Sequence, residues 1–162
     1  MKLDNKDSYD RIRGQFVIAI FIAATLISIS MFYDFFTNYF IPISRGAYAG
    51  IFSGILLLYI VYRFGLKYHF IIYDDESDKI LLRYYPVSSF MTKYTSIEIP
   101  FNALYQIEIQ KAFFNQREEL IIHQVVKKGI AKYKPIPLSA LSNKQKKDLI
   151  NALNSFAKVK MQ

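Results

Sequence analysis

The 162-residue chain contains no cysteine, and this absence removes several kinds of chemistry. Without thiols the chain forms no disulfide, carries no lipid attached to cysteine and offers no thiolate ligand to a metal ion. Its two histidines, His69 and His123, stand alone, and neither has a second ligand at metal-binding spacing. We therefore predict no metal site.

Catalytic signatures are also missing from the sequence. No Ser–His–Asp set, glycine-rich phosphate loop or pair of catalytic carboxylates can be assigned. The acidic run at 74–78 lacks the spacing and the glycine of an EF-hand loop, and it is typical of a solvated hairpin turn. We expect a protein that is not an enzyme and that uses no cofactor and no small-molecule substrate.

What the chain does contain is a mixture of apolar and charged sequence. Hydrophobic residues make up 52% and charged residues 21%, which suits a membrane segment fused to a water-exposed domain. The formal net charge is +8, but lysine and arginine are spread over several segments. The excess therefore indicates membrane topology and attraction to anionic lipid rather than nucleic-acid binding.

Two long apolar runs lie in the first half of the chain, at 15–33 and 45–63. At 1.5 Å per residue, a helix of about 20 residues nearly spans a hydrocarbon core of about 30 Å. A cleaved signal peptide is the alternative for the first run, but its leader carries acids and a second run follows at once. The sequence predicts a tail at 1–14, a two-helix transmembrane hairpin at 15–67 and a soluble domain at 68–162.

The connection between the two runs is short and aromatic, which forces the helices to be antiparallel. Asp34 and Arg45 bound this connection and are able to pair across it, although exposure to interfacial water is the reading we favour. The tail holds four basic residues, and the loop holds only Arg45. Arg63 and Lys67 flank the exit of the second run. We predict a multi-pass protein of the cell membrane with both termini cytoplasmic.

Small residues recur along one face of the second run, because Gly46, Gly50 and Gly54 are spaced four apart. Such a face lets another helix approach closely. The chain's own first run is the nearer candidate partner, and a second copy or another membrane protein is the other. The candidate packing residues are Gly46, Ala49, Gly50, Ser53 and Gly54 in the second run, with Ala19, Ala23, Ala24 and Ser28 in the first.

From residue 68 the period of apolar residues changes from helical to alternating, which predicts strands. Six strands can be assigned, at 69–73, 79–85, 95–101, 105–110, 119–126 and 130–136, with turns near 102, 115–117 and 127–129 and a loop at 86–92. The chain ends in an amphipathic helix. Ser142 and Gln145 form a capping box at its start. Its apolar stripe consists of Leu149, Ile150, Leu153, Phe156 and Ala157.

Two segments carry a family likeness: SIEIPFNALYQIEI at 96–109 and IPLSALSNKQKKDLINALNSF at 136–156. They resemble the central strands and the closing helix of bacterial pleckstrin-homology-like (PH-like) domains, some of which follow a two-helix membrane hairpin. The resemblance implies an α+β domain, an antiparallel partly open barrel or sandwich of 6–7 strands closed by one C-terminal helix. The full fold has seven strands, one more than we can assign. The acidic turn at 74–78 argues against phosphoinositide binding at the first hairpin.

We expect this protein to be a non-enzymatic accessory or scaffold subunit that docks a membrane or cytoplasmic partner. A peripheral sensor of anionic lipid is the first alternative, and a small transporter or channel component is the second. The face that would meet lipid or a partner consists of Lys127, Lys128, Lys132, Lys134, Lys144, Lys146 and Lys147. Such lysines also occur on ordinary solvated surfaces. The expected partners are the bilayer and another membrane protein or a second copy.

Overall fold

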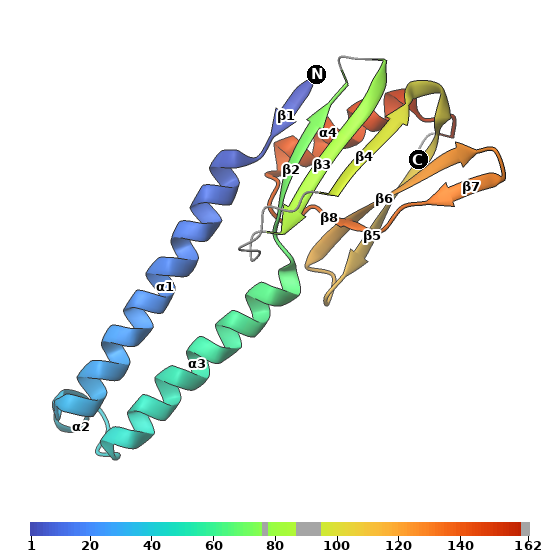
Figure 1. Ribbon diagram of the computed structural model, residues 1–162. Coiled ribbons are helices and arrows are strands. Elements are labelled where there is room, and N and C mark those ends of the chain that lie inside the picture. The colour runs from blue at the N-terminus through green and yellow to red at the C-terminus, as the bar shows by residue number, and fades with distance from the viewer. Residues whose placement is uncertain (76–77, 87–94, 160–162) are drawn as a thin grey trace. The chain divides into compact units, whose positions relative to one another are not determined.

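In the computed structural model, residues 1–75, 78–86 and 95–159 are described (Figure 1). The chain forms two compact units. The helical unit is Arg11–Gly65, and the strand unit joins Met1–Asp10 to Leu66–Gln162. The first ten residues therefore belong with the C-terminal part of the chain, although the sequence assigns them to a tail.

The helical unit contains most of α1 (Lys6–Phe32), the short α2 (Phe35–Tyr39) and most of α3 (Arg45–Leu66). At 1.5 Å per residue, α1 and α3 are about 40 Å and about 33 Å long. Both are long and apolar enough to cross a membrane, and only 6% of the most apolar window of each is buried. Because the helical conformation begins at Lys6 rather than at residue 15, α1 starts inside the strand unit.

Side chains connect α1 with α3 along one face of each helix. The rings of Phe16 and Tyr59 stack with centroids 6.4 Å apart, and the Arg63 guanidinium donates to the Ile12 carbonyl at 2.7 Å. At the far end of the hairpin, the Phe36 ring lies against the rings of Tyr48 and Phe52, at 5.3 and 5.2 Å. These contacts make α1 and α3 an antiparallel pair.

The connection between the helices is itself ordered. The Tyr48 hydroxyl accepts from the Ile41 N–H at 3.0 Å and donates to the Ile41 carbonyl at 2.9 Å. Asp34 and Arg45 form a bidentate ion pair, in which Arg45 Nε donates to Asp34 Oδ1 and Arg45 Nη2 donates to Asp34 Oδ2. The structure therefore shows pairing across the loop, and both side chains are also exposed, as favoured from the sequence. Arg45 lowers the pKa of the exposed Asp34 carboxyl by hydrogen bonding.

The strand unit consists of two antiparallel sheets and one C-terminal helix (Figure 1). The first sheet has the order β1-β2-β3-β4, and the second has the order β5-β6-β7 with β8 also paired to β6. The strands are β1 (Lys2–Asp4), β2 (His69–Asp74), β3 (Lys79–Pro86), β4 (Thr95–Pro100), β5 (Leu104–Ala112), β6 (Arg117–Val126), β7 (Gly129–Lys132) and β8 (Ile136–Pro137). A 3-10 turn at Phe101–Ala103 joins the sheets, and α4 spans Asn143–Phe156.

The core of the strand unit lies between the sheets and α4, and it uses the alternating residues that the sequence predicts. Ile80 and Leu82 of β3 are fully buried, as are Leu149 and Leu153 of α4. The Ser142 side chain accepts from the Gln145 N–H at 3.2 Å, and the Gln145 side chain accepts from the Ser142 N–H at 3.0 Å. The predicted capping box is confirmed.

Three predictions about the strand unit need correction. The predicted tail is not separate from the soluble domain, because Lys2–Asp4 forms β1 and pairs antiparallel with β2. Its single inward residue, Leu3, is 8% exposed. One apolar residue between two charged ones is too short an alternation to signal a strand. The turn expected at 115–117 lies at 113–116, and the strand expected at 130–136 is divided into β7 and β8. Residues 76–77 of the acidic turn and 87–94 of the predicted loop lie outside the described residues.

Candidate functional site

The glycines of α3 face away from α1. A Cβ atom built on Gly46, Gly50 or Gly54 would meet nothing within 4 Å outside its own stretch of helix. Ser53 is exposed on the same side, and Leu57 is 63% exposed. At about 100° per residue these five residues fall within an arc of about 100°. We call this set, Gly46, Gly50, Ser53, Gly54 and Leu57, the glycine stripe.

The other candidate packing residues divide between the two sides of the hairpin. Ala49 on α3 and Ala19 and Ala23 on α1 are partly covered, whereas Ala24 and Ser28 on α1 are exposed. The close approach that the glycines permit is therefore not used by α1. The glycine stripe is left open to whatever surrounds the hairpin.

The candidate lysines lie on α4 and along β6 and its neighbouring segments in the strand unit. Lys127 and Lys128 form the turn between β6 and β7. Lys146 lies in the first turns of α4, with its Nζ 2.9 Å from Glu118 Oε2 near the start of β6. Lys127 directly follows β6 and is nine positions from Glu118, which is about 30 Å at 3.3 Å per residue. Lys127 and Lys146 therefore lie at opposite ends of β6.

The other candidate lysines lie between or beside these two ends. Lys132 pairs with His123 of β6, and its Nζ lies 3.8 Å from Glu108 Oε2. Lys134 is exposed and follows Tyr133, whose N–H bonds to the Ile122 carbonyl. Near the start of β6, Lys144 and Lys147 are exposed on α4. The β6–β7 turn also presents the aliphatic residues Val125, Val126 and Ile130, which are 38%, 40% and 53% exposed.

Asn5, which sequence reasoning missed, connects three parts of the strand unit. Its side chain is 1% exposed. The amide nitrogen donates to the carbonyls of His69 and Ala140, at 3.0 and 3.4 Å, and the amide oxygen accepts from the Ile71 N–H at 2.8 Å. The side chain thereby satisfies backbone groups of β2 just beyond the last β1 pair. Pattern analysis cannot reveal this role, because nothing around Asn5 is periodic.

More contacts surround Asn5 where the chain enters α1 and leaves α3. The Gln145 side chain donates to the Asp4 carbonyl at 2.9 Å. The Tyr9 ring lies edge-on to Phe70, with centroids 5.5 Å apart, and 6.0 Å from Tyr85. We call Asn5, Tyr9, His69 and Phe70 the hairpin root. Both ends of the hairpin are anchored there, on β2 of the strand unit.

His69 is the titratable member of the hairpin root. Its Nδ1 lies 2.7 Å from the Lys67 carbonyl. Burial lowers the pKa of the His69 imidazole, opposed in part by that hydrogen bond, and the charges of Arg117 and Glu119 also act on it. Arg117 and Glu119 form an ion pair at 2.8 Å. The start of β6 is therefore close to the start of β2.

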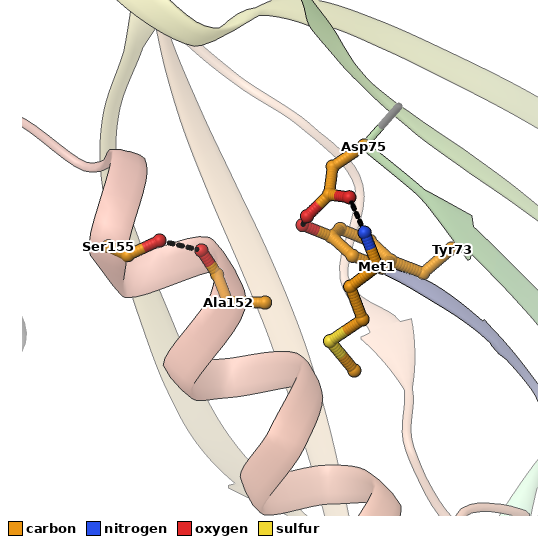
Figure 2. A network of polar contacts seen from close by, with 5 residues as sticks. All are labelled: Met1, Tyr73, Asp75, Ala152 and Ser155. Atoms are coloured by element: carbon orange, nitrogen blue, oxygen red, sulfur yellow. Dashed lines mark hydrogen bonds and ion pairs between the residues drawn. The ribbon is translucent and has the colours of Figure 1, made fainter. Parts of the chain in front are cut away.

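A second polar group lies at the other end of β2 (Figure 2). The buried Tyr73 hydroxyl donates to Asp75 Oδ2 at 3.0 Å, and the Met1 ammonium pairs with the same carboxylate. Burial raises the pKa of the Tyr73 hydroxyl. The figure also shows Ser155 of α4 donating to the Ala152 carbonyl at 2.7 Å.

In the part of the chain that the structure describes, no three His, Cys, Asp or Glu side chains gather where they could hold a metal ion.

Comparison of the chain with protein-family models, with curated proteins and with solved structures found no match. The features that bear on function are the glycine stripe, the candidate lysines and the hairpin root.

Proposed function

We propose that this protein is a non-enzymatic, membrane-anchored accessory or scaffold subunit that docks a partner through the glycine stripe. The observation that carries this proposal is the open face at Gly46, Gly50 and Gly54. In a membrane, helices associate mainly through close packing, which small residues permit. The partner we propose is a transmembrane helix of another protein or of a second copy.

Membrane insertion is supported by the apolar surface of the helical unit. Phe21 and Leu58 are 72% and 70% exposed, and the rest of both apolar windows is similarly uncovered. Contiguous apolar surface of this extent is rare on a protein in water, because exposure costs roughly 25 cal/mol per Å². In a bilayer the lipid tails cover it. We propose that α1 and α3 both span a bacterial inner membrane.

The proposed orientation follows from the pairing of β1 with β2. Asp4 of β1 lies opposite Ile72 of β2, so the strands that flank the hairpin in sequence are neighbours in one sheet. Both ends of the hairpin must then be on the side of the membrane that holds the strand unit. The excess of lysine and arginine near those ends supports a cytoplasmic position for that side.

For the strand unit we propose a PH-like identity. Two antiparallel sheets closed by a C-terminal helix agree with that architecture. β1 also supplies the strand that the sequence-based assignment lacked. In this arrangement the transmembrane hairpin is an insertion between the first and second strands of the domain.

A second candidate function is the sensing of anionic lipid through the β6–β7 turn. Lys127 and Lys128 stand there beside the exposed aliphatic residues Val126 and Ile130. Basic and apolar residues together are typical of segments that bind a membrane surface. The glycine stripe plays no part in this alternative.

The scaffold proposal is tested by purifying the tagged full chain from its native membranes in mild detergent and identifying co-purified proteins by mass spectrometry. Gly50→Leu fills the glycine stripe and should remove the partner from the preparation. Ala24→Leu adds similar bulk to the exposed face of α1 and should leave the partner in place. A wild-type chain that remains a lone monomer with no companion would overturn the proposal.

A further inference from the structure

The turn between β5 and β6 holds two phenylalanines in a costly conformation. Phe113, Phe114 and Asn115 have φ values of 48°, 53° and 63°, in the left-handed region that residues with a Cβ seldom adopt. The Gln116 N–H closes the turn on the Phe113 carbonyl at 3.1 Å. The Phe114 side chain is 88% exposed, more than any other large apolar residue in the described chain.

Phe114 itself gives the strand unit little packing in return for this backbone strain, because its side chain is exposed. The Phe114 ring meets the Phe113 ring edge-on, with centroids 5.5 Å apart, and otherwise projects away from the core. Strained backbone that presents an exposed side chain is common at functional sites. An aromatic residue held out in this way suits a membrane–water boundary, where aromatic rings collect.

The turn is located at the hairpin-root end of the strand unit. Arg117, which follows the turn directly, acts electrostatically on His69, the first residue of β2. Lys146 of α4 contacts Glu118, and the neighbouring Gln145 contacts Asp4. Figure 1 shows the β5–β6 turn near the start of β2. The turn thus lies on the same side of the strand unit as both connections to the hairpin.

We propose that Phe114 and its turn insert into the interfacial layer of the bilayer that the hairpin spans, and so hold the strand unit against the membrane. This inference rests on the proposed membrane anchoring. Exposed cations accompany the turn at this end: Lys111 on β5, and Lys144 and Lys147 on α4. They complement the negative charge of an anionic cytoplasmic leaflet.

Insertion of Phe114 and lipid sensing by the β6–β7 turn would bring opposite ends of β6 to the membrane. β6 separates the two turns and has ten residues, which is about 30 Å. A strand unit that rests on the membrane at Phe114 keeps Ile130 in water. A strand unit that rests on Lys127 and Lys128 brings Ile130 to the membrane and keeps Phe114 in water.

The absence of tryptophan from the chain provides the test. Three single-tryptophan variants of the full chain, Phe114→Trp, Ile130→Trp and Ile55→Trp, are reconstituted into vesicles of phosphatidylcholine and phosphatidylglycerol. Fluorescence is compared between ordinary lipids and lipids with bromine on the acyl chains. Ile55 is 60% exposed on α3 and reports on membrane insertion itself. Ile130 is the matched control for an exposed apolar position on the strand unit.

We expect brominated lipid to quench Phe114→Trp and Ile55→Trp, with blue-shifted emission, and to leave Ile130→Trp unquenched. Quenching at Ile55→Trp but not at Phe114→Trp would overturn this inference and leave membrane anchoring intact. Quenching at Ile130→Trp in place of Phe114→Trp would also overturn it and favour lipid sensing. Blue-shifted but unquenched Phe114→Trp would show protein contact and contradict the inference. An unquenched Ile55→Trp would overturn membrane anchoring together with the inference.

Discussion

A single buried amide, that of Asn5, bonds to β2 and to the segment before α4. The side chain meets the His69 carbonyl, the Ala140 carbonyl and the Ile71 N–H. Each of these backbone groups would otherwise be buried without that partner, at a cost of about 1–3 kcal/mol for a group left unsatisfied. The hairpin root therefore depends on one residue that immediately precedes α1.

Asn5→Ala should lower the free energy of unfolding of the strand unit by about 2–3 kcal/mol, because it removes the partners of buried donors and acceptors. The measurement is urea unfolding of the full chain in mild detergent, followed by the near-ultraviolet dichroism of its tyrosines. Asn102→Ala, at an exposed position, serves as the control and should change stability by less than about 0.5 kcal/mol. Equal effects of the two substitutions would contradict the role assigned to Asn5.

His69 should make the stability of the strand unit depend on pH. Because burial lowers its pKa in the folded state, the unfolded state binds more protons below the unfolded value of about 6.5. The contribution is complete above about pH 6.5 and is lost as pH falls toward the folded pKa. His69→Gln should flatten the fall in the unfolding midpoint between about pH 6.5 and 5. An unchanged slope in this variant would show that His69 is not the responsible group.

Among the helices and strands, the periodicity of apolar residues predicted the longer ones. Two apolar runs, six alternating strands and an amphipathic helix all have counterparts in the structure. β1 was not predicted, because Leu3 is its only buried residue and its partner strand lies 68 or more residues away. The direction of the glycine stripe was not predictable either, since spacing shows that Gly46, Gly50 and Gly54 share a face but not what that face meets.

β1, at the edge of the first sheet, should be able to open while the second sheet stays paired. Leu3→Ala removes most of its buried side chain and should cost about 2–3 kcal/mol. Hydrogen exchange resolved along the chain should then speed up in β1 and in Ile72–Asp74 of β2 more than in the paired centres of β5 and β6. Lys2→Ala, at an exposed position, should leave exchange unaltered. Uniform acceleration throughout both sheets would contradict a local role for β1.

At the scale of the whole molecule, the chain combines an apolar hairpin with a strand unit that holds both ends of that hairpin. The sequence predicted this division, but it assigned the first ten residues to a tail. It also predicted one lysine face, and two of its members, Lys127 and Lys146, lie about 30 Å apart along β6. Separation along a strand depends on register and pairing, which residue composition does not reveal.

Photo-cross-linking in native membranes tests whether the glycine stripe receives a protein. A photoreactive phenylalanine analogue is placed at Leu57, within the stripe, or at Ile55, which is about 160° around the same helix. The two side chains are 63% and 60% exposed, so both are equally accessible. The account predicts a discrete protein adduct at Leu57 and none at Ile55. Absence of protein adducts at Leu57, or equal adducts at both positions, would contradict it.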